Sequence, residues 1–269
     1  MGCQVLLVTQ KFQTIGEMSC NPSFGGIGKG HLMKEIDALD GICARACDES
    51  GIQYRVLNRS KGPAVQGPRA QIDRNLYKNF VQKELGQKTP NLEILESTVE
   101  DLIVRNGQCQ GVILGNGEHI EASGVILTTG TFLRGQINIG LDVFPAGRMD
   151  DAPAIGLAQT LDKMKFKLGR LKTGTPPRIK AQTVNYEILE SCSGDEPPVP
   201  FSFMNEKVWL ERENRPQKNC HITHTNEKVH ELILDNMHLN RHVSEEITVR
   251  LLFFMIFQFQ TMLFVILFF

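Results

Sequence analysis

One early segment, residues 18–32, carries the side chains best suited to chemistry. It reads MSCNPSFGGIGKGHL and combines a cysteine, an Asn-Pro pair, four glycines, a lysine and a histidine. Glycines let the backbone adopt positive φ and let a flat ligand or a phosphate approach main-chain N–H groups. Cys20 adds a nucleophile. The composition predicts a loop rather than a helix or strand, and a Gly-rich surface turn with a structural cysteine is the competing interpretation.

Two other pairs of thiols or histidines have a spacing that could begin a metal site. Cys43 and Cys47 lie four residues apart on an expected helix, and His221 and His224 lie three apart. Neither pair has a further ligand pair at suitable spacing, so we expect a core-facing thiol pair, a surface turn and no metal site. The cysteines are odd in number and scattered, which favours reduced thiols in a reducing compartment: Cys3, Cys20, Cys43, Cys47, Cys109, Cys192 and Cys220.

Length and charge leave the class of protein open. The chain has 269 residues, which suits one large domain or two smaller ones. Its 29 basic and 30 acidic residues nearly balance, so any contact with nucleic acid must come from local basic patches.

The order of the expected elements is more informative. Apolar periodicity predicts two helices, at residues 37–50 and 69–85. Strands are expected at 4–9, 53–57, 92–95, 99–104, 111–114 and 118–122, and a buried strand within 124–131 runs into a Thr-Thr-Gly-Thr turn. This order is typical of a dinucleotide-binding α/β domain. No G-x-G-x-x-G turn precedes the first strand, so we expect the chain to begin at the second strand of that fold.

The C-terminal segment differs from the rest of the chain. Residues 251–269 carry no charge and hold seven of the 15 phenylalanines. This length and polarity meet the criterion for a transmembrane candidate. A tail anchor, a buried core segment and a foreign tail joined to a truncated protein are the three interpretations, and the third is favoured.

Eight sequence blocks resemble one known family. They read, in chain order, MSCNPSFGGIGKGHL, EIDALDG, NRSKGPAVQGPRAQIDR, VEDLI, LTTGTFLRG, GRLKTGTPPR, PFSF and ITHTNEK. Together, from about residue 5 to about residue 243, they resemble the GidA family, also called MnmG, and some blocks resemble its mitochondrial branch.

The resemblance implies a fold class and a division into domains. The expected fold is α/β, a partial FAD-binding Rossmann-like domain of the glutathione-reductase type with an inserted α+β region and without its first βα unit. The expected domains are residues 1–155, a partial FAD-binding domain; residues 156–243, an inserted and incomplete substrate region; and residues 244–269, a hydrophobic tail foreign to the family.

The resemblance also implies an activity. Family members modify C5 of the wobble uridine of tRNA, using FAD, reduced nicotinamide (NADH) and methylenetetrahydrofolate. They act with an MnmE-type GTPase partner, as homodimers, and a mitochondrial location is implied for this branch. The alternative is a non-catalytic truncated isoform or fragment that binds tRNA or a partner and associates with membranes through its tail. A folate- and FAD-dependent tRNA uridine methyltransferase fits the blocks less well.

The family motifs carry over residue by residue. Cys20 matches a cysteine implicated in catalysis, and a thiolate that adds at C6 of uridine makes C5 nucleophilic. Lys29 and the glycine N–H groups could favour that thiolate. The expected FAD contacts are Thr9, Ser19, Asn21, Gly25, Gly26, Val99, Thr129, Gly130, Thr131 and Ala154, the last without the hydroxyl usual in the family. The expected tRNA phosphate contacts are Arg69, Arg74, Arg170, Lys172 and Arg178.

Two family blocks do not occur in this chain. They are the GGGHAG phosphate loop and the PRYCPSIE block with a second functional cysteine. The phosphate loop normally supplies N–H donors and a helix dipole to the FAD pyrophosphate. We therefore expect weak or absent FAD binding and an open sheet edge where the first strand would lie.

Overall fold

The computed structural model describes residues 2–171, 173–174, 176–241 and 264–268. Two compact units emerge from the contacts within it. The first comprises residues 1–19, 84–174 and 226–269, and the second comprises residues 20–83 and 175–225. Both units therefore combine segments that are far apart in the sequence. The predicted domain boundaries near residues 155 and 243 stay a prediction.

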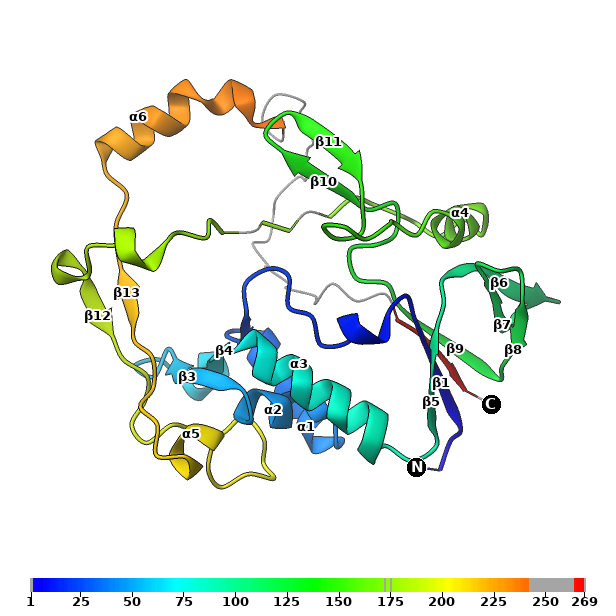
Figure 1. Ribbon diagram of the computed structural model, residues 1–269, viewed down its shortest axis with the longest axis horizontal. Coiled ribbons are helices and arrows are strands. Elements are labelled where there is room, and N and C mark those ends of the chain that lie inside the picture. The colour runs from blue at the N-terminus through cyan, green and yellow to red at the C-terminus, as the bar shows by residue number, and fades with distance from the viewer. Residues whose placement is uncertain (1, 172, 175, 242–263, 269) are drawn as a thin grey trace. The chain divides into compact units, whose positions relative to one another are not determined.

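The main sheet of the first unit has four strands, in the order β5 (Leu92–Glu96), β1 (Val5–Thr9), β14 (Phe264–Phe268) and β9 (Gly124–Thr128). β1 runs parallel to β5, and β14 runs antiparallel to both β1 and β9 (Figure 1). The strands β1, β5 and β9 consequently point the same way, and their carboxyl ends share one edge. The predicted α/β class with parallel strands is confirmed.

β14 belongs to the C-terminal tail, most of which lies outside the described residues. Phe264 pairs with both Thr9 and Thr128, at the carboxyl ends of β1 and β9. The expectation of an open sheet edge beside β1 is therefore wrong, because β14 fills the place between β1 and β9. Among the described residues, no helix is long and apolar enough to cross a membrane.

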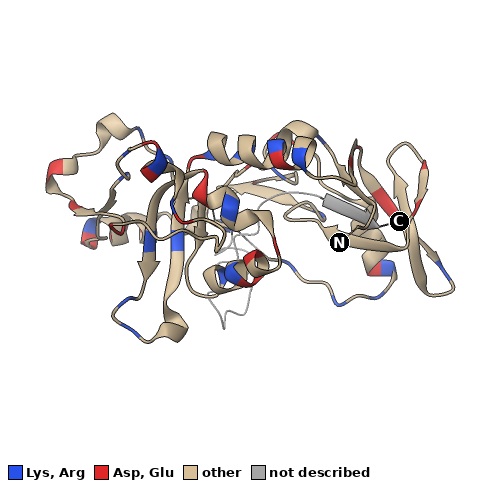
Figure 2. Cartoon of the chain, turned by 90° about the horizontal axis from the view of Figure 1, so that it is seen from below, with Lys and Arg blue, Asp and Glu red and all other residues tan. Residues whose placement is uncertain are grey.

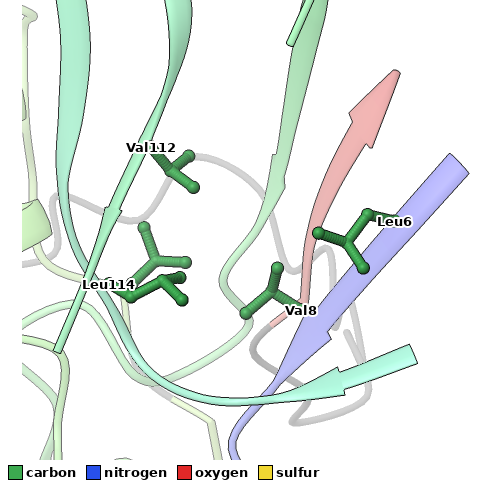
Figure 3. Packing of buried hydrophobic residues seen from close by; sticks show 5 residues of the cluster. Leu6, Val8, Val112 and Leu114 are labelled. Carbon is green, nitrogen blue, oxygen red and sulfur yellow. The ribbon is translucent and has the colours of Figure 1, made fainter. Parts of the chain in front are cut away.

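A three-stranded meander packs beside this sheet. It consists of β6 (Val99–Arg105), β7 (Gln108–Leu114) and β8 (His119–Glu121), as the sequence predicts. The buried core of the unit lies between the two sheets and is formed by Leu6, Val8, Val99, Val112 and Leu114 (Figure 3). Burying an aliphatic side chain of this kind contributes roughly 1.5–3 kcal/mol.

β9 is less buried than expected. Val125 and Leu127 pack against the core, but Ile126, between them, is 45% exposed. Successive side chains of a strand point to opposite faces, so only one face of β9 is covered within its unit. The rest of the first unit consists of β10 (Gln136–Ile139), β11 (Asp142–Pro145), α4 (Gly156–Lys163), α6 (Glu227–Asp235), the short turns Phe12–Thr14 and Met237–Leu239, and a π-turn at Glu84–Lys88.

The second unit is built on an antiparallel sheet in the order β2 (Ser23–Gly25), β4 (Gly67–Ile72) and β3 (Gly51–Leu57). Its helices are α1 (Lys29–Ala38), α2 (Ile42–Asp48), α3 (Arg74–Lys83) and α5 (Trp209–Arg212). β12 (Glu190–Cys192) pairs with β13 (Cys220–Ile222), and short 3₁₀ turns occupy Pro63–Val65, Ala181–Thr183 and Tyr186–Ile188.

Three expectations for this unit are wrong in part. The segment 18–32 is not all loop, because β2 pairs with β4 and α1 begins at Lys29, after Gly28 turns the chain at a φ of +78°. The helix expected at 37–50 is two helices, since Asp40, with a φ of +64°, ends the first. The helix expected from residue 69 starts at Arg74, because the preceding residues belong to β4.

Two buried carboxylates fix a distant loop to these helices. Asp48 of α2 accepts the N–H groups of Phe201 (2.7 Å) and Ser202 (2.9 Å). Asp37 of α1 accepts the hydroxyl of Ser202 (2.8 Å) and the N–H of Phe203 (2.7 Å). Burial raises the pKa of Asp48, and the hydrogen bonds that it accepts oppose this. The blocks EIDALDG and PFSF are thus in contact.

Candidate functional site

Cys20 lies in the second unit, on the loop that leads into β2, and is half-buried. The guanidinium of Arg74 donates a hydrogen bond to the carbonyl oxygen of Cys20 at 2.5 Å. Two residues further on, the carbonyl of Pro22 accepts the N–H of Ile72 at 2.7 Å. The N–H of Ser23 donates to the carbonyl of Asn21 at 2.8 Å. The cysteine loop is therefore attached to the junction between β4 and α3.

The glycines after Cys20 have a packing role. Gly25 and Gly26 have φ values of +98° and +89°, which favour glycine. A Cβ atom on Gly25 would lie 1.9 Å from the carbonyl oxygen of Pro68, and the N–H of Gly26 donates to that same oxygen at 2.9 Å. Close approach to β4 thus accounts for Gly25, and the positive φ accounts for Gly26. The predicted contact of both glycines with the flavin stays a prediction.

His31, on the first turn of α1, is a residue that the sequence did not single out as a site residue. Its Nδ1 accepts the N–H of Gly28 at 3.2 Å, so in the neutral ring Nε2 carries the proton. Within the described part of the chain, Nε2 of His31 is the one buried side-chain nitrogen or oxygen atom that lacks a hydrogen-bond partner. A buried donor of this kind is uncommon and can serve a bound group.

Lys29 is largely buried at the start of α1. Its ammonium lies 4.3 Å from the ring centroid of Phe24 and donates to the carbonyl of Ser23 at 3.4 Å. Burial lowers the pKa of Lys29, and the nearby thiols of Cys43 and Cys47 oppose that shift. The predicted effect of Lys29 on Cys20 stays a prediction.

The thiols of α2 form a pair against Tyr77. The Sγ of Cys43 lies 3.8 Å from the hydroxyl of Tyr77, and Cys47 is fully buried. A hydrogen bond with Cys47 lowers the pKa of Cys43, whereas burial raises the pKa of Cys47. No cluster of three or more His, Cys, Asp or Glu residues that could hold a metal ion occurs among the residues described.

The first unit holds a separate group of predicted cofactor contacts at the edge of its sheet. Thr9 is buried at the carboxyl end of β1, and its carbonyl accepts the N–H of Ser97 at 2.9 Å. Val99 begins β6 and is 2% exposed, within the core. Ser19 ends a segment of this unit and is half-buried.

The turn after β9 is brought together with Ala154. Gly130 has a φ of +52°, and the hydroxyl of Thr131 donates to the carbonyl of Gly147 at 2.6 Å. The carbonyl of Thr129 accepts the N–H of Phe132 (3.1 Å), whose own carbonyl accepts the N–H of Ala154 (2.8 Å). Residues 129–131 and Ala154 are far apart in sequence and form one compact group.

Basic residues are interspersed with acidic ones over the chain (Figure 2). Arg69 lies within β4, opposite Gly25 of β2 and Arg55 of β3. Arg170 donates to the carbonyl of Arg134 at 2.9 Å, and Arg178 is exposed. Lys172 lies outside the described residues. Of the five basic residues expected to contact phosphates, Arg74 is the one that the structure places against Cys20.

The parallel pairing of β1 with β5 and the glycine-containing turn after β9 define an α/β protein with a partial Rossmann-like fold. A family model described as "Glucose inhibited division protein A" matches residues 1–251. The chain belongs to this family, the GidA family.

Curated relatives share this sequence closely. The mitochondrial 5-taurinomethyluridine-[tRNA] synthase subunit MTO1 of Pongo abelii is 58% identical over 252 residues, which cover 91% of this chain and 36% of that protein. The tRNA uridine 5-carboxymethylaminomethyl modification enzyme MnmG of Granulibacter bethesdensis is 53% identical over 240 residues, covering 88% of this chain and 37% of the relative. This chain thus spans little more than a third of the length of these relatives.

A solved structure has the same fold. The GidA of Aquifex aeolicus, in its form I crystal, is 41% identical and superposes with a TM-score of 0.79, over 86% of this chain and 39% of that one. Its form II crystal gives 38% identity and a TM-score of 0.80, over 90% of this chain and 42% of the other. The α/β fold expected from the resemblance is confirmed.

Proposed function

We propose that this chain is part of an FAD-dependent enzyme that modifies C5 of the wobble uridine in tRNA. The observation that carries the proposal is the 53–58% identity to relatives named as tRNA uridine modification enzymes. The non-catalytic alternative is not favoured by these relatives.

Cys20 is the proposed nucleophile. Its thiolate adds to C6 of uridine, and the electron pair of the C5–C6 double bond moves to C5 and the adjacent carbonyl. C5 then attacks the methylene carbon of methylenetetrahydrofolate, and one of the two C–N bonds of that carbon breaks. Loss of the C5 proton and elimination of the thiolate restore the C5–C6 double bond and the free cysteine. An amine then replaces tetrahydrofolate on the methylene carbon, and tetrahydrofolate leaves. The half-buried Cys20, on a loop attached to β4 and α3, suits this role because its backbone is held in place.

FAD is the cofactor that the family implies, and candidate contacts for it occur within each unit. In the first unit, Thr9, Ser19, Val99, residues 129–131 and Ala154 would hold it, and the glycine turn after β9 permits close approach of backbone. In the second unit, Asn21, Gly25 and Gly26 would contact it, and the buried Nε2 of His31 offers a donor for a bound group. When bound, FAD would accept electrons from NADH.

The proposed partners and location are those that the family resemblance implies. tRNA is the substrate, an MnmE-type GTPase and a second copy of the enzyme are the protein partners, and the location is mitochondrial. Arg69, Arg170, Lys172 and Arg178 stay candidates for contacts to tRNA phosphates.

Nucleoside analysis of tRNA tests the proposal. The gene for this chain is disrupted, and total tRNA is digested and analysed by mass spectrometry. We expect the C5-modified wobble uridine to disappear, and to return when the gene is restored. Unchanged levels of this nucleoside in the disrupted cells would contradict the proposal.

A further inference from the structure

We propose that Arg74 is a positioning residue for Cys20, in place of the tRNA contact expected from the sequence. The inference rests on the proposed role of Cys20. Its basis is the hydrogen bond of 2.5 Å from the guanidinium of Arg74 to the carbonyl of Cys20, across 54 residues of chain. A hydrogen bond from a charged donor is about twice as strong as a neutral one.

The backbone of Arg74 is itself well fixed. Arg74 is the first residue of α3, and Asp73 caps that helix by accepting the N–H groups of Asn75 (2.9 Å) and Leu76 (3.0 Å). The N–H of Asp73 donates to the carbonyl of Ser50 at 2.8 Å. An arginine anchored in this way can hold a flexible loop, because little of its own backbone freedom is left to lose.

The contact with Arg74 extends an existing series of contacts along the cysteine loop. Ser23 and Gly25 pair with β4, and Pro22 accepts the N–H of Ile72. Arg74 continues this series to Cys20 itself. The peptide plane of this carbonyl contains the Cα of Cys20, so the hydrogen bond from Arg74 restrains that plane and the position of the Cα. Arg74 would thereby restrict where the thiol lies without touching the reacting atoms.

Alkylation of Cys20 tests the positioning role in the purified chain. Iodoacetamide labelling is followed by peptide mass spectrometry, with the exposed Cys109 as the internal reference. We expect Arg74→Gln to change the ratio of Cys20 to Cys109 labelling rates by at least threefold. Arg74→Lys should restore part of the difference, and Lys61→Gln, with the same change of charge, should leave the ratio unchanged. An unchanged ratio in Arg74→Gln would overturn the proposal.

Labelling of the buried Cys47 reports on the fold of each variant. If Cys47 becomes labelled in Arg74→Gln, the test uses Arg74→Lys in its place. A shift in the ratio of Cys20 to Cys109 labelling rates in Arg74→Lys supports the positioning role, and an unchanged ratio overturns it. Because labelling requires neither tRNA nor FAD, failure of the proposed function would leave this result intact.

The salt dependence of tRNA binding separates positioning from phosphate contact. A phosphate contact predicts that Arg74→Gln lowers the slope of log K against log salt by about 0.7–1. The positioning role predicts the same slope as the unchanged chain, together with altered Cys20 labelling. A lowered slope with unaltered labelling would overturn the proposal.

Discussion

At the scale of single residues, the glycines of residues 18–32 have two possible explanations, the approach of a ligand and packing against a neighbouring strand. The sequence predicts that Gly25 and Gly26 permit a ligand to approach, and in the structure Gly25 permits the close approach of β4. The oxygen of Pro68 occupies the space that a Cβ on Gly25 would need, whereas the positive φ of Gly26 is what favours glycine there. Packing against β4 therefore requires Gly25 whether or not a flavin is bound.

Substitution of Gly25 tests this packing role. Gly25→Ala combines a φ of +98° with a Cβ 1.9 Å from a backbone oxygen, so we expect a loss of about 2–4 kcal/mol in the free energy of unfolding. Gly62→Ala is the matched control, because nothing lies within 4 Å of its Cβ position and its φ is −65°. Urea denaturation measures both, and equal stabilities would contradict the packing role.

Cys20 could be chosen from sequence because a cysteine beside Asn-Pro and four glycines is an unusual combination. The contact between Arg74 and Cys20 could not be predicted from the sequence. Arg74 and Cys20 are 54 residues apart, and only the pairing of β2 with β4 brings the two segments together. From composition alone, a basic residue such as Arg74 in a loop-rich region suggests a phosphate contact. The group that it binds in the folded chain depends on tertiary structure.

At the scale of elements, an ion-pair group attaches the loop after β1 to a distant segment of the same unit. Asp151 lies 2.9 Å from Lys11 and 2.7 Å from Arg148, and the side chains of Asp151 and Arg148 are only 8% and 10% exposed. Burial raises the pKa of Asp151, but the hydrogen bonds from Lys11 and Arg148 outweigh it, and the pKa lies below the ordinary value of 3.8.

This shift predicts how stability depends on pH. Because the folded-state pKa is lowered, the contribution of Asp151 is present above about pH 4 and is lost as the pH falls through the folded-state value. We expect Asp151→Asn to lower the free energy of unfolding at pH 7 by about 1.5–3 kcal/mol. That difference should shrink below pH 4.

Denaturant titrations at several pH values measure the effect. Asp162→Asn is the control, since its pair with Arg134, at 3.4 Å, is exposed and should be worth less than about 1 kcal/mol. A pH-independent loss in Asp151→Asn would contradict the assignment of the shift to these ion pairs.

Periodicity and turn residues predicted seven of the strands and parts of α2 and α3, and they failed where pairing decides the structure. β1, β3 and β5–β9 follow from apolar runs and turn residues such as Asn116 and Gly117. The strands β4 and β2 could not be predicted in this way, because Gly67 and Pro68 are typical of turns and Gly25 is typical of a loop. These residues become strands by pairing with each other and with β3. β14 was also missed, since its place between β1 and β9 depends on a contact across the whole chain.

At the scale of the whole molecule, the predicted cofactor contacts divide between two units. Thr9, Val99, residues 129–131 and Ala154 belong to the first unit, whereas Asn21, Gly25 and Gly26 belong with Cys20 to the second. The blocks that identify the family are likewise found in both. The sequence could nominate residues for a cofactor site, because each lies in a recognisable block, and their membership of that site stays a prediction. It could not assign them to units, since both units combine distant segments.

The central claim is that Cys20 provides the chemistry of this chain, and nucleoside mass spectrometry of tRNA tests it most directly. Cells in which the gene is disrupted are supplied with the unchanged gene, with Cys20→Ser or with Cys109→Ser, an exposed cysteine outside the proposed site. The account predicts that the unchanged chain and Cys109→Ser restore the C5-modified wobble uridine and that Cys20→Ser does not. Full restoration by Cys20→Ser would contradict it.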